Sequence, residues 1–288
     1  MIALIRLLTR PDFRAHPLRG VWRRVWWRVR WWLTSRPLLT TVGNGLRIAV
    51  PRSSSAAPLF YGGWSEPEEA ALLERLVHPS DVVFDVGAHV GEYTLLAAAR
   101  SATVHSFEPN PANAALLRAN VASNALANVT VHECAVSDRE CQVRFLAHRD
   151  PSLSALWTER QTHAGYSEIT VRAIPLDSVT VPRIDVIKID VEGAELAVLR
   201  GARAILARPP ETAPVVVFEF APGNYARFGC APRDVLNLLT GHGYRIARID
   251  GTPFDGWPAE LSMVNLIASK RPIWPLVPRG TSGQRGQA

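Results

Sequence analysis

The sequence contains little cysteine, no long apolar run and no closely spaced set of metal ligands. Its three cysteines, Cys134, Cys141 and Cys230, form neither a C-x-x-C pair nor an even set for disulfides, which favours a reducing compartment. No segment approaches the ~20 uninterrupted apolar residues of a transmembrane helix, and the first residues lack a signal-peptide pattern. We therefore expect a cytoplasmic protein. Asp190 and Glu219 are the candidates for metal assistance, but because no His/Cys/Asp cluster has ligand spacing, no bound metal is predicted.

Acidic residues are almost absent from the N-terminal arm, residues 1–37. Nine arginines there stand against Asp12 alone, so the arm carries +8 and the remainder of the chain +6 − 8 = −2. Residues 21–33 combine five tryptophans with four arginines. At helical spacing one side would carry the apolar set Trp22, Val25, Trp26, Val29 and Leu33. This pattern predicts a peripheral helix in the membrane interface, at the inner face of the membrane; packing on the chain itself or on a partner subunit, and nucleic-acid binding, are the alternatives.

The glycine pattern of a dinucleotide-binding loop, Gly-x-Gly-x-x-Gly, is also missing. Instead, the apolar run Val82–Val86 leads into Asp-x-Gly-x-x-x-Gly, formed by Asp85, Gly87 and Gly91, and then into a helical pattern. A carboxylate before such a turn repels phosphates but suits a ligand with an ammonium or sulfonium charge. The motif favours S-adenosylmethionine over NAD, with an ordinary strand–helix turn as the alternative.

Strand-like and helix-like segments alternate through the rest of the chain. This order predicts an α/β fold with a doubly wound, mainly parallel sheet. The expected strands are residues 82–86, 103–107, 129–134, 184–189, 215–218, 244–249 and 263–268, and the expected helices are residues 68–77, 93–99, 112–124, 194–206 and 233–240.

The same pattern gives the expected organisation of the chain. A hairpin and a helix occupy residues 38–80, the main domain residues 81–270, and a disordered tail residues 271–288. A polar connection, residues 147–167, is long enough to cover the active site.

Several acidic residues follow the predicted strands. Glu108 comes 23 residues after Asp85, the separation at which an acid reaches the ribose hydroxyls of an adenosine ligand. Asn110 begins the next helix or joins this site. Ala135 and Val136 are candidates to flank an adenine, and the neighbouring Asp138 either accepts from the adenine amine or forms a turn.

The fourth strand places charged residues in an apolar setting. Lys188, Asp190 and Glu192 lie in it or just beyond it, and Glu219 follows the next strand. Buried charges are costly unless they are paired or functional, so either Lys188 forms an internal ion pair or these groups carry chemistry. Asp190 and Glu219 are the candidate catalytic pair, because an attacking hydroxyl must lose its proton during methyl transfer.

Four motif blocks together resemble the FkbM family of S-adenosylmethionine-dependent methyltransferases. The blocks are FDVGAHVGEYT, FEPNP, AVSD and IKIDVEGAE followed by LRGA, and the resemblance covers about residues 59–268. It implies a class I methyltransferase fold, Rossmann-like with a seven-stranded sheet, and usually O-methylation of sugar or polyketide hydroxyls. His89 departs from the asparagine more common in the family. The implied cofactor contacts are Asp85, Gly87, His89, Gly91, Tyr93, Thr94, Glu108, Asn110, Ala135, Val136 and Asp190.

Two other functions compete with this interpretation. A nucleic-acid N-methyltransferase shares the fold, but such enzymes usually carry an Asn/Asp-Pro-Pro-aromatic turn where this chain has Asp190-Val191-Glu192-Gly193. A membrane-recruited binding module with an inactive cofactor pocket would not need an intact set of acids and glycines. We therefore expect a small-molecule or glycan acceptor and no nucleic-acid partner.

Overall fold

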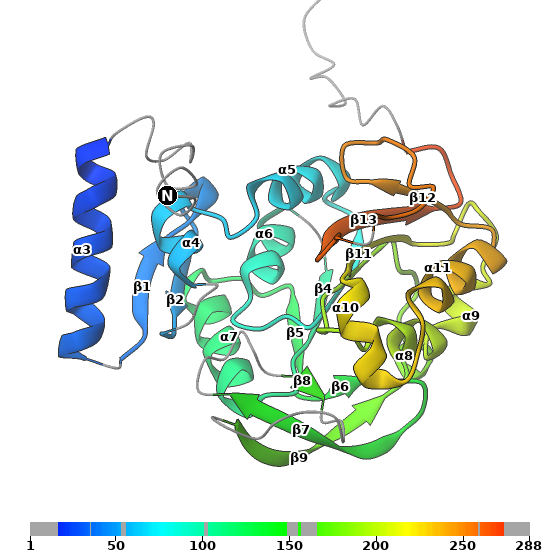
Figure 1. Ribbon diagram of the computed structural model, residues 1–288, viewed down its shortest axis with the longest axis horizontal. Coiled ribbons are helices and arrows are strands. Elements are labelled where there is room, and N and C mark those ends of the chain that lie inside the picture. The colour runs from blue at the N-terminus through cyan, green and yellow to red at the C-terminus, as the bar shows by residue number, and fades with distance from the viewer. Residues whose placement is uncertain are drawn as a thin grey trace, which may run out of the picture.

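The structure is a computed structural model of the 288-residue chain, and it describes residues 17–34, 36–52, 56–100, 103–148, 155–156, 166–258 and 260–273 (Figure 1). Most of the predicted cover over the active site, residues 147–167, lies outside the described residues. The same holds for residues 1–16 of the arm and for nearly all of the predicted tail.

A seven-stranded sheet forms the centre of the protein, in the order β12-β13-β11-β10-β3-β4-β5. Strand β13 runs antiparallel to both of its neighbours, and the pairs from β11 to β5 are parallel. The strands are β3 (Val82–Val86), β4 (Thr103–Phe107), β5 (Val129–His132), β10 (Val186–Ile189), β11 (Val215–Phe220), β12 (Arg245–Arg248) and β13 (Val264–Ser269). The predicted doubly wound sheet is confirmed.

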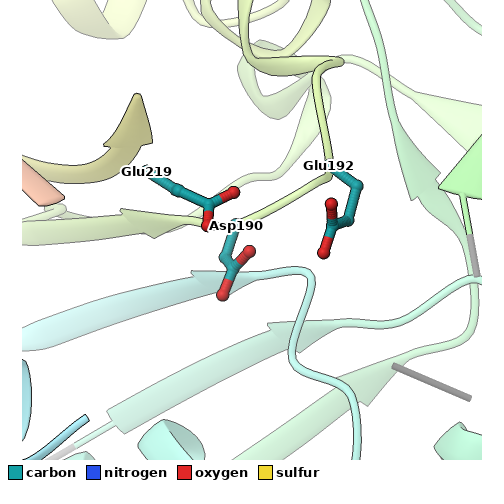
Figure 2. A group of neighbouring side chains, drawn as sticks. All are labelled: Asp190, Glu192 and Glu219. Atoms are coloured by element: carbon teal, nitrogen blue, oxygen red, sulfur yellow. The ribbon is translucent and has the colours of Figure 1, made fainter. Parts of the chain in front are cut away.

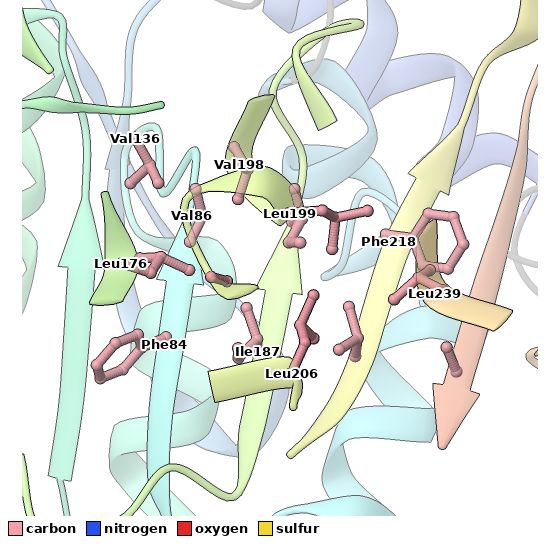
Figure 3. Close-up of a cluster of buried hydrophobic side chains, with 14 of the residues drawn as sticks. Phe84, Val86, Val136, Leu176, Ile187, Val198, Leu199, Leu206, Phe218 and Leu239 are labelled. Atoms are coloured by element: carbon pink, nitrogen blue, oxygen red, sulfur yellow. The ribbon is translucent and has the colours of Figure 1, made fainter. Parts of the chain in front are cut away.

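Alternating side chains of the central strands reach two separate cores. Phe84, Ile187 and Phe218 point to one face and pack against helices of the C-terminal half (Figure 3). Val83 and Val217 point to the opposite face, among apolar residues of the helices that precede and follow β3. Burial on both faces explains why these strands read as continuous apolar runs.

The sheet is covered by helices close to the predicted ones. They are α5 (Pro67–Leu76), α6 (Glu92–Arg100), α7 (Pro111–Ser123), α8 (Glu195–Arg200), α9 (Arg203–Leu206), α10 (Pro222–Tyr225) and α11 (Pro232–Gly241). The single helix predicted for residues 194–206 is wrong in one respect, since it is divided at Gly201 and Ala202. A Cβ at Gly201 would lie 2.0 Å from the carbonyl oxygen of Ser137, so another segment passes directly against this point.

A second, smaller sheet lies beside the first. Its order is β6-β9-β7-β8, with the long antiparallel pair β7 (Cys141–His148) and β9 (Tyr166–Ile174) and the short strands β6 (Ala135–Val136) and β8 (Ala155–Leu156). The sequence indicated strand-like pieces here but not a sheet. Strand pairing across a long connection is a non-local property that local patterns do not reveal.

The N-terminal region adds a helix and a hairpin at one edge of the molecule (Figure 1). Helix α3 (Pro17–Leu33) is followed by β1 (Leu38–Thr41), a turn at Gly43–Gly45, β2 (Arg47–Val50) and α4 (Ala56–Gly62). The hairpin was predicted, whereas α4 was not. Among the described residues, no helix has both the length and the apolar content needed to cross a bilayer.

Two asparagines of α7 join this hairpin to the main domain. Asn120, which is 1% exposed, accepts a hydrogen bond from the Ala49 N–H at 2.7 Å and donates to the carbonyls of Ala49 and Val90. Asn124 makes the same pair of bonds to the backbone of Arg47, but at the surface. One buried and one exposed amide therefore hold the same strand.

We predict that Asn120→Ala destabilises the protein much more than Asn124→Ala. The first change leaves the half-buried backbone groups of Ala49 and the buried carbonyl of Val90 unpaired, at a cost of about 2–4 kcal/mol, whereas water replaces the lost partner at Arg47 for less than about 1 kcal/mol. Urea denaturation of both variants measures the difference. Equal losses would show that the hairpin is not held through the buried amide.

Candidate active site

The predicted acidic residues meet at one edge of the central sheet. From β3 the chain proceeds outward through β4 and β5, and from β10 it proceeds in the opposite direction through β11. The boundary between β3 and β10 is therefore the point where the strand order reverses, and ligands of open α/β sheets bind at the carboxyl ends of the strands there. Asp85 and Asp190 come from these two strands, and Glu108 and Glu219 from their outer neighbours.

The turn after β3 is shaped by close backbone packing. Gly87 has a φ of +85°, and a Cβ there would lie 1.8 Å from the carbonyl oxygen of Asp190. A Cβ at Gly91, with a φ of +96°, would lie 2.3 Å from Leu117 in α7. The sequence suggested that these glycines admit a ligand, but protein atoms occupy the space in both cases. His89 has a φ of 51°, as expected of a residue that replaces asparagine in a left-handed turn.

Asp85 lies beneath this turn and is 2% exposed. Its Oδ2 accepts a hydrogen bond from the Thr94 hydroxyl at 2.6 Å, and that hydroxyl lies 2.7 Å from the Ser106 hydroxyl on β4. Its Oδ1 is buried without a hydrogen-bond partner among the described residues. Burial raises the pKa of Asp85, while Lys188 and the Thr94 hydroxyl favour the charged form.

Lys188 occupies the position opposite Asp85 on β10 and is 3% exposed. Its Nζ lies 3.0 Å from Asp190 Oδ2 and 4.1 Å from the centre of the Tyr93 ring. Burial alone would lower the pKa of Lys188, but the carboxylates of Asp190, Glu69 and Asp85 outweigh burial and raise the pKa above its usual value. The internal ion pair considered for this strand is present, and it holds one oxygen of Asp190.

Glu108 follows β4 directly and is 5% exposed. The His89 N–H donates to its Oε2 at 2.8 Å, and the Asn110 N–H donates to its Oε1 at 2.9 Å. Asn113 adds a longer contact of 3.3 Å to Oε1. Burial raises the pKa of Glu108 to about 7 despite these donors. The turn and the first residues of α7 thus fix the carboxylate in one orientation, and its Oε2 retains acceptor capacity.

A cluster of three carboxylates lies beyond β10 and β11. Asp190, Glu192 and Glu219 each place a carboxylate oxygen within 4.8 Å of the others (Figure 2). Burial, together with the charges of Asp190 and Glu192, raises the pKa of Glu219 to about 9, so Glu219 is protonated at neutral pH. The sequence placed Glu219 after the strand, but β11 continues to Phe220. Such oxygen ligands also suit a hard cation; the expectation of no metal stays a prediction.

The site fits the charge of S-adenosylmethionine. Asp85 Oδ1 and Glu219 Oε2 are buried oxygens with no partner in the described part of the chain. Lys188 and the Thr94 hydroxyl favour the charged form of Asp85, which suits a positive charge, whereas the protonated Glu219 is neutral. Glu108 offers an oriented acceptor at the position expected for ribose hydroxyls. When bound, the cofactor would supply an activated methyl group on a sulfonium, and Asp85 and Glu108 are the residues we expect to hold it.

Other predicted cofactor residues have structural partners in this arrangement. Thr94 is 0% exposed and supports Asp85, while the Tyr93 ring covers Lys188. Ala135 and Val136 are each 4% exposed and form the short strand β6 in the second sheet. Asp138 is more exposed and pairs with Arg139 at 3.7 Å, and both of its candidate roles, at the adenine or in a turn, stay predictions. Contacts of these residues with a cofactor stay predictions.

The sequence interpretation missed the acids that come from α5 and α6. Glu69 is 3% exposed, and burial raises its pKa to about 7. Glu92 accepts from both the N–H and the hydroxyl of Ser65 at 2.6 Å and so holds the start of the α5 segment against α6. The sequence did indicate that Glu69 is buried, because Glu69 lies at helical spacing from the buried residues Leu72, Leu73 and Leu76.

We predict that Lys188→Met lowers the free energy of unfolding by about 3–5 kcal/mol near pH 8, because a cluster of buried carboxylates loses its cation. The loss should shrink near pH 5. Without Lys188 the folded pKa of Glu69 rises beyond about 7, and a raised folded pKa favours folding below the unfolded value of 4.5 and disfavours it as pH increases. Denaturation at both pH values measures this, with Lys270→Met as control; a loss independent of pH contradicts it.

Comparisons with known proteins identify the family of this chain. The Methyltransferase FkbM domain family matches residues 85–246, more than half of the chain. The chain is 30% identical over 228 residues to 31-O-demethyl-FK506 methyltransferase FkbM of Streptomyces tacrolimicus, covering 68% of this chain and 82% of that protein. It is 29% identical over 180 residues to hexuronic acid methyltransferase AglP of Haloferax volcanii, covering 61% and 68%.

A solved structure, methyltransferase FkbM from Methylobacillus flagellatus KT, is similar with a TM-score of 0.42 and 18% identity, over 75% of this chain and 55% of that one. The family match includes the turn after β3, the acid after β4 and the carboxylates beyond β10 and β11. On this evidence the chain belongs to the FkbM family of methyltransferases.

Proposed function

We propose that this protein transfers a methyl group from S-adenosylmethionine to a hydroxyl of a sugar, a glycan or a secondary metabolite. The observation that carries the proposal is the carboxylate cluster of Asp190, Glu192 and Glu219 at the reversal point of the sheet. The two curated relatives support the acceptor class, since one is named for 31-O-demethyl-FK506 and the other for hexuronic acid.

The cluster suits the acid–base demand of this reaction. As the hydroxyl oxygen forms its bond to the methyl carbon, the bond from carbon to sulfur breaks and the hydroxyl proton must leave. Three carboxyl groups this close cannot all ionise at low cost, and burial and its neighbours raise the pKa of Glu219 to about 9, so this group keeps a proton at neutral pH. Asp190, held by Lys188, is oriented to receive the hydroxyl or its proton.

Glu108→Ala should weaken binding of S-adenosylmethionine by roughly ten- to several-hundred-fold. The lost carboxylate accepts ribose hydrogen bonds in our proposal, and each charged hydrogen bond contributes about 1.5–3 kcal/mol. Isothermal titration calorimetry measures the affinity. Glu133→Ala is the matched control, because Glu133 lies nearby in sequence and pairs only with the surface residue Arg118 in the described structure. Unchanged affinity in Glu108→Ala would remove this residue from the site.

Asp190→Asn and Glu219→Gln should each lower kcat by ~10²–10⁴ while the affinity for S-adenosylmethionine changes little. The assay follows S-adenosylhomocysteine formation with hexuronic acid glycosides as trial acceptors. Normal turnover in both variants would show that neither residue is catalytic. Loss of cofactor binding in Asp190→Asn would instead make Asp190 a cofactor-holding residue.

A further inference from the structure

Helix α3 presents an apolar surface that nothing in the described structure covers. Most large apolar side chains exposed by the described residues belong to this one helix. The set, here called the outer stripe, is Leu18 (87% exposed), Val21 (50%), Trp22 (62%), Val25 (56%), Val29 (47%), Trp32 (84%) and Leu33 (67%). These positions recur at i, i+3, i+4, i+7, i+11, i+14 and i+15, so they share one side of the helix, within an arc of about 120°.

The opposite side of α3 is occupied by the protein itself. Trp31 is 6% exposed, and the Trp27 ring stacks on Phe60 of α4 at 5.3 Å between centroids. Trp26, expected on the lipid side, also stacks on Phe60 at 5.4 Å. One side of this helix therefore packs on the domain, and the other side exposes an apolar face. Its inner tryptophans fix it at the edge of the molecule (Figure 1), and the side chains of the outer stripe are exposed.

Arginines lie between the two faces. Arg23 and Arg24 place their guanidinium groups over the rings of Phe60 and Tyr61, at 4.6 and 4.5 Å. Arg28 is exposed, and Arg30 bonds to the carbonyls of Thr34 and Arg36. The helix contains no acidic residue. An apolar stripe bordered by cations matches the layering of an anionic membrane surface, in which phosphates lie above the acyl chains.

We propose that α3 is an interfacial membrane anchor whose outer stripe inserts into an anionic lipid surface. The helix is 17 residues long, about 25 Å, and lies along the surface rather than across it. Trp22 and Trp32 would occupy the headgroup level, where tryptophan is favoured. A second copy of the chain fits less well, because two such helices would bring arginines together with no acid to pair with them.

The test is sedimentation of the full-length protein with vesicles of equal parts phosphatidylcholine and phosphatidylglycerol at low salt. Wild-type protein should sediment with these vesicles and far less with pure phosphatidylcholine. The double variant Trp22→Ser/Trp32→Ser should lower vesicle affinity roughly tenfold or more, through loss of buried apolar area. Arg28→Gln should lower it about fivefold, since each cation near the surface contributes about 1 kcal/mol.

The matched control is Leu39→Ser/Met263→Ser, which removes exposed apolar side chains outside α3 and should leave sedimentation unchanged. The thermal midpoint and the S-adenosylmethionine affinity are measured for every variant. They distinguish a loss of vesicle binding from a loss of folding or of the methyltransferase site. Failure of the wild type to bind anionic vesicles overturns the proposal, as does equal binding by the tryptophan variant. Dimers that dissociate in this variant, or vesicle-independent binding to duplex DNA through α3, would also overturn it, in favour of those partners.

Discussion

The buried ammonium of Lys188 is the interaction on which the site depends. Its charge acts on carboxyl groups from five parts of the chain: Asp85 on β3, Asp190 after β10, Glu66 and Glu69 at the start of α5, Glu92 on α6 and Glu219 on β11. A cation in the middle of a sheet is costly by itself, but here it compensates acids that would otherwise be buried uncompensated. One side chain thereby allows an acidic, partly buried end of the sheet, and such an end suits a ligand that brings a positive charge.

The acids of this site have different surroundings and therefore different proposed roles. Glu108 is held by backbone N–H groups of His89 and Asn110, an arrangement that fixes its direction. Glu219 has no backbone donor in the described structure, and burial together with its acidic neighbours outweighs the charge of Lys188 and raises its pKa to about 9. Two carboxyl groups of similar intrinsic acidity therefore serve as an oriented acceptor and as a proton-bearing group, which is how proteins commonly separate binding from acid–base work.

The two sides of helix α3 have different surroundings. Its inner side, with Trp27 and Trp31, closes the small core formed with the hairpin and α4, and its outer stripe remains apolar. Exposed apolar area of this kind promotes aggregation in a freely diffusing protein. Its presence is explained if a partner surface covers the outer stripe. Arg23 and Arg24 place their guanidinium groups over aromatic rings of α4 and keep their charge at the boundary between the two sides.

The sequence by itself determined the order of strands and helices, the acid–glycine turn after β3 and the position of Glu108, because hydrophobic period and short spacing are local properties. Tertiary structure alone decided which atoms fill the turn at Gly87, where the Asp190 carbonyl takes the place expected for a ligand. It also brought Glu69 close enough to the Lys188 ammonium to interact with it, although more than a hundred residues separate the two in the sequence. Finally, it decided which side of α3 is covered by the protein. Tryptophans on both sides of that helix make its local pattern ambiguous, and only contact with Phe60 resolves it.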